Sequence, residues 1–171
     1  MSADETRSST GDSTMGPNNA EADPRLAERI RRLTTEQPYA VLCTQGHGQP
    51  YGSVVAFAFA HDLSFAVFAT SVATRKYRLL TECDRVALVV DNRPDYPKDM
   101  MKVEAFTATG HVKEVGRGAE FDEYSRLFIN RHPQLESFVR AASCALFRID
   151  IVRFFHVTRF QEVGQWVPPS P

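Results

Sequence analysis

Hydrophobic residues recur along the chain with two different spacings, and the change from one to the other predicts the order of the elements. Leu26, Ile30 and Leu33 have the spacing of one helical face. We expect this helix to begin at Asp23-Pro24, an N-cap followed by proline at the first helical position, and to end before Pro38. The apolar residues that follow mostly alternate or run continuously, which is typical of strands.

Six later segments have the pattern of strands, and three have the pattern of helices. The expected strands span residues 39–44, 51–60, 64–69, 85–91, 103–115 and 145–160, and the expected helices span 74–81, 117–130 and a short stretch after Pro133. The connections between the first strands are too short for parallel crossovers. The order therefore predicts a mainly β fold, a six-stranded antiparallel β-barrel with peripheral helices.

The sequence also predicts the burial of one strand and irregularities in two others. Residues 85–91 are nearly continuous in apolar side chains, so we expect this strand to be buried on both faces. Gly110 predicts a bulge or bend in the strand over 103–115. The last strand is expected to be interrupted near Asp150, with Trp166 in a short tail after it.

The strand over residues 51–60 has two unlike faces. Ser53, Val55 and Phe57 share one face, whereas Val54 and the alanines share the other. These alanines are Ala56, Ala58 and Ala60. A face of small side chains leaves room for a bulky neighbour. That neighbour is either a helix or large core side chains, or a planar ligand that lies across the strand.

Composition restricts the class of protein. The 171 residues are 43% hydrophobic, enough for one domain, which we place at 23–171 after a polar, disordered tail at 1–22. A net charge of −1 gives no general attraction to nucleic acid. Neither a bilayer-spanning run nor a signal pattern is present, so we expect no membrane partner and a cytoplasmic location. Cys43, Cys83 and Cys144 are expected to be free thiols.

No group of side chains predicts acid–base, nucleophilic or metal chemistry. The five histidines are scattered, and His111 has no evident partner on its strand. No cysteine or histidine cluster has the spacing of metal ligands. A structural or exposed role is therefore the expectation for every histidine.

One stretch has an unusual placement of charge. Thr74 is a candidate N-cap, and Arg75 and Lys76 follow it in the first turn of the expected helix. Acidic residues are usual at this end, because the helix dipole is positive there. The two cations are either solvated side chains of a surface helix or half of an anion site, since free N–H groups at a helix N-terminus favour phosphate.

In this context the chain resembles the FMN-binding split-barrel superfamily, of which pyridoxamine 5′-phosphate oxidase is a member. The resemblance covers residues 36–115 well and the remainder loosely. In that family a hydroxyl-Arg-Lys triplet opens a helix and holds the flavin phosphate. Thr74, Arg75 and Lys76 match the triplet, and Thr70 matches a hydroxyl just before it. The resemblance implies a split barrel, FMN as cofactor and oxidoreductase activity.

The resemblance also assigns roles outside the triplet. The strand with Ser53, Val54, Val55 and Ala56 corresponds to the one whose backbone faces the isoalloxazine ring. Family members are homodimers with flavin at the interface, and the aromatic-rich segment 154–166 suits such an interface.

Two further residues receive functional expectations, each with a competing one. Arg93 is expected to lie at the rim of the flavin pocket, or else in a solvated loop. Trp166 reaches the partner's flavin, or else belongs to the core.

The C-terminal part departs from the family pattern. Residues 158–166 do not reproduce the motif with arginine and histidine that grips the substrate in pyridoxamine phosphate oxidase itself. The expected function is therefore oxidation or reduction of another small molecule, which the sequence does not identify. The alternatives are a carrier or sensor that binds flavin or haem without turnover, and a reductase that uses deazaflavin (F420).

Overall fold

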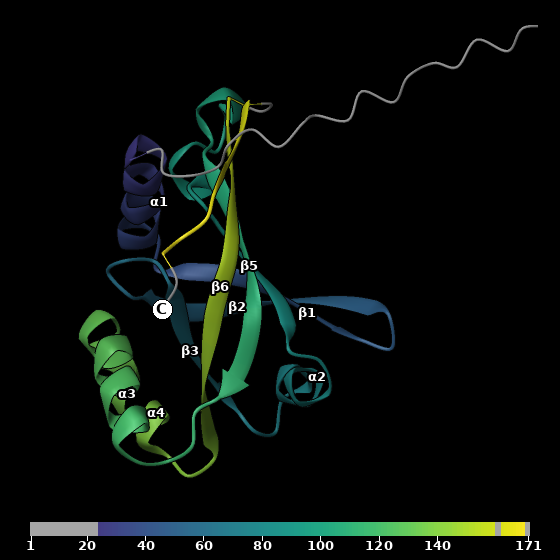
Figure 1. Cartoon of the computed structure of the whole chain (residues 1–171), viewed down its shortest axis with the longest axis vertical. Helices are drawn as coiled ribbons and strands as arrows, with labels where there is room; N and C mark the ends of the chain where they lie inside the picture. The colour runs from purple at the N-terminus through teal and green to yellow at the C-terminus, as the bar shows by residue number, and fades with distance from the viewer. Residues whose placement is uncertain (1–23, 160–161, 170–171) are drawn as a thin grey trace, which may run out of the picture.

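The computed structural model describes residues 24–159 and 162–169 (Figure 1). The tail expected at 1–22 lies outside the described residues. The helices are α1 (Pro24–Glu36), α2 (Arg75–Glu82), α3 (Ala119–Arg131) and α4 (Glu136–Arg140). The strands are β1 (Tyr39–Gly46), β2 (Gln49–Phe59), β3 (Phe65–Ser71), β4 (Arg85–Asp91), β5 (Ala105–Glu114), β6 (Cys144–Thr158) and β7 (Glu162–Trp166). Short 3-10 turns occupy Arg93–Asp95, Met100–Lys102 and Pro133–Leu135.

The strands form one antiparallel sheet in the order β3-β2-β1-β4-β5-β6-β7. Strand β3 also pairs with β6, which closes six strands into a barrel and leaves β7 as an addition beside β6. Helices α1 and α3 lie on one side of the barrel in Figure 1, and α2 lies on the other. The predicted fold, mainly β with a six-stranded antiparallel barrel and peripheral helices, is confirmed.

The barrel is split between β2 and β3. Strand β2 pairs with β1 along residues 49–56, but with β3 only through Phe57, Ala58 and Phe59. Within the described residues, the segment Gln49–Ala56 therefore has a strand on one side only, and we call its other side the split edge. The backbone N–H and C=O groups that point outward along this edge have no sheet partner.

The alanines of β2 meet a helix. Ala58 is buried in a cluster with Phe121 and Phe128 of α3, and Ala56 packs against the same cluster. Val54, on the same face but nearer the turn to β1, is 68% exposed. The sequence left open whether protein or a planar ligand covers this face. Helix α3 covers it at Ala56 and Ala58, whereas Val54 is left exposed.

Two expectations about the last strands were wrong. An irregularity is present at Gly110 as expected, but its unpaired residue, Val152, belongs to β6. Strand β6 runs without interruption through Asp150, and β7 was missed because its residues, with glycine in the middle, lack a strand pattern. The irregularity lies in the register between β5 and β6, which shifts at Thr109/Gly110. A Cβ at Gly110 would overlap the backbone oxygen of Asp150, so this close approach requires glycine.

The expectation that β4 is buried on both faces was also wrong. Val86, Leu88 and Val90 face the core, whereas Ala87 and Val89 on the other face are only partly buried. The outward row continues across neighbouring strands, because Val41 pairs with both Val89 and Val54. A strand that is apolar on both faces thus has only one of them covered by this chain.

Helix α1 is attached to the barrel by an apolar face and by one buried carboxylate. Glu104 is 4% exposed and accepts hydrogen bonds from Arg29 Nε at 2.6 Å and from Arg32 Nη2, and its Oε1 lies 2.8 Å from His156 Nε2. Its backbone N–H donates to Asn92 Oδ1 at 2.7 Å. A buried charge is stable only with such partners, so this cluster links α1 and β6 to the residue that precedes β5.

The cluster sets a sign for the pH dependence of stability. Burial lowers the pKa of His156 below its ordinary value of 6.5, against the opposing effect of Glu104. Burial alone would raise the pKa of Glu104, but hydrogen bonds from Arg29 and His156 outweigh it, so its pKa is lowered. Both groups bind protons less readily in the folded state than in the unfolded state.

The free energy of unfolding is therefore expected to fall as the pH drops below 6.5. In this range His156 binds a proton in the unfolded protein but stays neutral in the folded protein. Each such histidine contributes a slope of at most about 1.4 kcal/mol per pH unit. His132, also buried with a lowered pKa, adds a second contribution of the same sign. Urea denaturation at pH 8, 6.5 and 5 measures the slope. A flat profile from pH 6.5 to 5 would contradict the neutral, buried state of both histidines.

Candidate functional site

The start of α2 is the first part of the candidate site. Thr74 caps the helix, because its hydroxyl oxygen accepts from Tyr77 N at 3.2 Å while its own O–H donates to the carbonyl of Ser71 at 2.9 Å. Thr70, at the end of β3, lies 3.2 Å from Thr74, oxygen to oxygen. The turn from strand to helix thus places two hydroxyl groups beside the free N–H groups of the first helical turn.

The cations of this turn have no acidic partner among the described residues. Neither Arg75 nor Lys76 forms an ion pair with any described residue, and the first turn contains no acidic side chain. Lys76 is half-buried, and this burial lowers the pKa of its ammonium group. An uncompensated, partly desolvated cation at the positive end of a helix is unfavourable unless an anion binds there.

Strand β2 approaches this turn from the split edge. The Arg75 guanidinium lies over the ring of Tyr51, with its Cζ 5.1 Å from the ring centroid. Two residues further, the hydroxyl oxygen of Ser53 is buried and has no hydrogen-bond partner among the described residues. Tyr51 was not among the predicted site residues, although it shares a face of the strand with Ser53. That shared parity was the signal that could have indicated it.

The predicted residues at the split face one another across the gap between β2 and β3. The three pairs that join these strands begin with Phe57 opposite Phe68. If that register continued, Thr70 would stand opposite Val55 and Ala69 opposite Ala56. Thr70 pairs with Ala145 of β6 along one edge of β3, but along the other edge it has no partner in β2. The gap therefore separates an edge of free backbone groups from the hydroxyl and cationic groups of the α2 turn.

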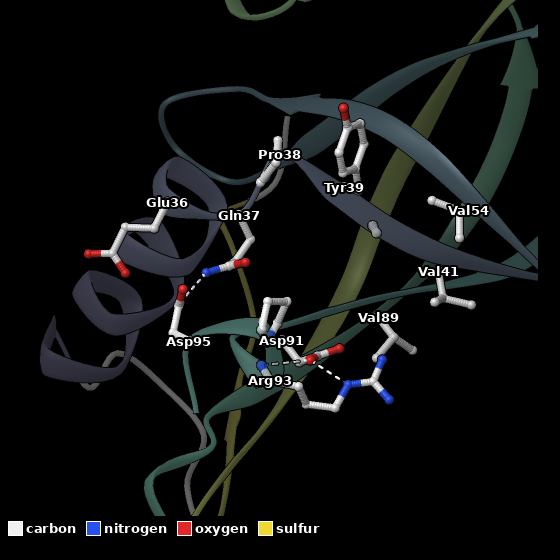
Figure 2. Close-up of a pocket in the computed structure, with 12 residues that line it drawn as sticks. Glu36, Gln37, Pro38, Tyr39, Val41, Val54, Val89, Asp91, Arg93 and Asp95 are labelled. Carbon is white, nitrogen blue, oxygen red and sulfur yellow. Dashed lines mark hydrogen bonds and ion pairs between the residues drawn. The ribbon is translucent and has the colours of Figure 1, made fainter. Parts of the chain in front are cut away.

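Two other predicted residues, Val54 and Arg93, line a single cavity of about 880 Å³ (Figure 2). Its apolar floor includes Val41, Val54 and Val89 on three adjacent strands. Arg93 is held at the rim, because its Nε and its backbone N–H both donate to Asp91 Oδ1, at 2.6 and 3.0 Å. This ion pair raises the pKa of Arg93, which stays cationic.

The predicted residues thus divide into two groups. Thr70, Thr74, Arg75 and Lys76 are not among the residues drawn around the cavity of Figure 2. Strand β2 connects the groups, since Ser53 and Val54 are neighbours on opposite faces of it.

Trp166 lies elsewhere. It is 6% exposed, packs against Phe154 with ring centroids 5.5 Å apart, and belongs to the main core cluster. Of the two expectations for this residue, its position agrees with a core tryptophan, since a side chain buried within its own chain is not available to a partner's flavin.

The histidines are placed largely as structural residues, with one correction. His132 and His156 are buried, and His132 contacts the carbonyl of Phe57 at 2.9 Å. His111 does have a partner, because its Nδ1 lies 2.8 Å from Asp84 Oδ2 on the surface. No group of three or more potential ligands in the described part of the chain could hold a metal ion, and no helix there is long and apolar enough to cross a membrane.

Comparison with known proteins assigns the family. The family model of pyridoxamine 5′-phosphate oxidase matches residues 26–158, which contain the whole barrel and the α2 turn. The chain belongs to the pyridoxamine 5′-phosphate oxidase family. A search of curated proteins found no significant match.

Solved structures with the fold of this family include proteins with different ligands. A haem-binding protein from Mycobacterium smegmatis is 15% identical with a TM-score of 0.73, over 82% of this chain and 57% of that protein. A FAD-binding protein from Mesorhizobium loti is 15% identical with a TM-score of 0.61, over 75% and 91%. A Clostridium acetobutylicum protein related to general stress protein 26, of the pyridoxinephosphate oxidase family, is 12% identical with a TM-score of 0.66, over 85% and 96%.

At these identities the structures establish the shared fold alone. The family fold is thus compatible with flavin-binding and haem-binding members, and the residues of the site must discriminate between ligands.

Proposed function

We propose that this protein binds FMN in the split between β2 and β3 and acts as an oxidoreductase on a small molecule. The observation that carries the proposal is the cationic turn at the start of α2, where Arg75 and Lys76 have no acidic partner among the described residues. A phosphate dianion would provide the missing charge. Arg75 offers a planar fork to two oxygens, Lys76 a point charge and Thr74 a hydroxyl group.

The split edge suits the ring of the same ligand. An isoalloxazine is flat and carries polar groups along one edge, so it needs close approach to backbone donors and acceptors. Residues 52–56 of β2 have backbone groups without a sheet partner on that side. The buried hydroxyl of Ser53, which also has no partner in the described residues, supports the presence of a polar ligand atom beside it.

The roles of protein and cofactor are separate in this proposal. Bound FMN supplies the redox chemistry, which explains why no acid–base or nucleophilic group of side chains is required. The chain anchors the phosphate at α2, aligns the ring along β2 and offers the cavity over Val54 as space for an apolar substrate. The rim cation Arg93 would favour negative charge on a bound molecule.

A homodimer is part of the proposal. The outer face of the sheet exposes Val54 by 68%, Tyr39 by 56% and Val152 by 50%. Exposed apolar side chains grouped on a sheet face are typical of an interface, and a second copy would cover them and close the cavity.

Light scattering after gel filtration tests the dimer. We expect wild-type protein at twice the chain mass and Val54→Asp largely at the monomer mass, because the new charge would be buried at the interface. Phe138→Asp changes an exposed apolar residue of α4 rather than of the sheet, and this variant is expected to stay dimeric. A flavin-loaded wild-type monomer would contradict the shared site.

A binding role without turnover is the second candidate, and the haem-binding protein with the same fold favours it. The two candidates differ in one measurement. An oxidoreductase loaded with flavin should lose its yellow colour when NADH or NADPH is added without oxygen, whereas a carrier or sensor should not.

The absorption spectrum of protein purified from its own host, together with the mass of the released cofactor, tests the proposed ligand. Bound FMN predicts the visible absorption bands of an oxidised flavin and a released cofactor with the mass of FMN. A deazaflavin or haem spectrum with the matching mass would overturn the assignment.

A further inference from the structure

A second cavity, of about 410 Å³, lies between α1, α3 and the turn that joins β2 to β3. Its charged lining residues are Arg31 of α1 and Arg131 of α3, and His61 of the turn also contributes. No aspartate or glutamate is among the residues that line it. The remaining wall is largely apolar and includes Phe59, Leu63 and Leu127.

Arg131 is unusually short of partners for a partly buried cation. Its Nη2 donates to the backbone carbonyl of Gln37 at 2.7 Å and reaches that of Thr35 at 3.5 Å. Its Nε is buried without a partner, and its Cζ lies 5.0 Å from the ring centroid of Phe57. Burial lowers the pKa of Arg131, and no described carboxylate forms an ion pair with it.

The second arginine is only weakly neutralised. Arg31 Nε donates to the carbonyl of His61 at 3.3 Å, and its Nη1 lies 3.5 Å from the highly exposed carboxylate of Glu28. An exposed pair at this distance contributes little. The cavity therefore combines an apolar wall with two cations that lack a strong anionic partner.

We propose that this cavity binds a small amphipathic carboxylate, with its head group at Arg131 and Arg31 and its aliphatic or aromatic body against the apolar wall. A carboxylate is planar and matches the fork of a guanidinium group. The volume lies within the range of small-molecule sites. The structural contacts of Arg131 with the end of α1 and the α1–β1 connection use only Nη2, so Nη1 is left for a ligand.

This site is separate from the phosphate end of the flavin site. The cavity lies at the Phe65 end of β3, whereas the α2 turn follows Ser71 at the other end. Seven residues of strand, at about 3.3 Å each, place the two roughly 20 Å apart. Loss of flavin binding should therefore leave carboxylate binding unchanged.

Titration calorimetry with octanoate, octanamide and octylamine tests the proposal, because the three probes share a tail and differ in head group. We expect octanoate to bind and the other two to bind at least about tenfold more weakly, since they lose charge-assisted hydrogen bonds. The Arg75→Ala/Lys76→Ala protein should bind octanoate as wild type does, which separates this site from the flavin site.

Variants locate the binding. Arg31→Gln and Arg131→Gln are each expected to weaken octanoate by about tenfold or more. Thr35→Glu, at the exposed rim, should weaken it by repulsion, while Thr35→Gln should not. Arg126→Gln, on the same helix but outside the cavity, is the matched control for charge. Equal binding of the three probes, or wild-type affinity in Arg31→Gln and Thr35→Glu, would overturn the proposal even if Arg131→Gln did not fold.

Discussion

Replacing Arg75 and Lys76 together by alanine is expected to weaken FMN binding by about 10²–10⁴-fold, because two charge-assisted contacts of about 1.5–3 kcal/mol each would be lost. The fold should not suffer, since neither side chain has an acidic partner among the described residues. Removing two cations from the positive end of α2 should leave the stability of the flavin-free protein unchanged or slightly higher. Fluorescence titration with FMN and urea denaturation of the flavin-free protein measure the two effects.

Arg78→Ala is the matched control for this double variant. Arg78 is an exposed cation of the same helix, two residues after Lys76. Its removal tests whether general positive charge or the particular first-turn cations hold the phosphate. We expect a change in affinity of less than about threefold, as for a screened surface charge. A yellow, fully loaded double variant would remove the basis for the phosphate site.

Replacing Glu104 by glutamine is expected to lower the free energy of unfolding by about 2–3 kcal/mol and the melting temperature by roughly 5–10 °C. The carboxylate is the common acceptor for Arg29 and Arg32, and it also contacts His156. A neutral amide would leave the two arginines without their buried counter-charge, and its NH₂ group cannot accept from them. Thermal and urea denaturation measure the loss.

Glu28→Gln provides the comparison for Glu104→Gln. Glu28 lies on α1 itself, but its carboxylate is exposed and forms a loose ion pair, with Oε2 at 3.5 Å from Arg31 Nη1. Its replacement should change stability by less than about 0.5 kcal/mol. If Glu104→Gln were as mild as Glu28→Gln, the buried cluster would not be what attaches α1 to the barrel.

The sequence predicted the barrel well because its signals are local. Alternating residues of β2, the cap at Thr74 and the close approach at Gly110 each depend on neighbours in the chain or on one steric requirement. The order of strands followed from short connections. The expected strands and helices appear in the structure in the predicted order, with β7 added.

What the sequence could not provide depends on contacts between distant segments. Tyr51 meets Arg75, and the Ser53 hydroxyl lacks a partner among the described residues, in the part of β2 that does not pair with β3. The cluster around Glu104 joins residues more than fifty positions apart in the chain, such as His156. The apolar sequence of β4 led to the wrong expectation that both of its faces are buried. A sequence shows that a face is apolar, but it does not show whether the same chain or another molecule covers that face.

We propose that a phosphate group bound at the start of α2 anchors the cofactor. Titration of the flavin-free protein with FMN and with riboflavin, which differ only in the phosphate, tests it most directly. We predict that FMN binds at least about 100-fold more tightly than riboflavin, and that Arg75→Ala/Lys76→Ala removes most of this difference. Equal affinity of the wild-type protein for the two flavins would contradict the claim.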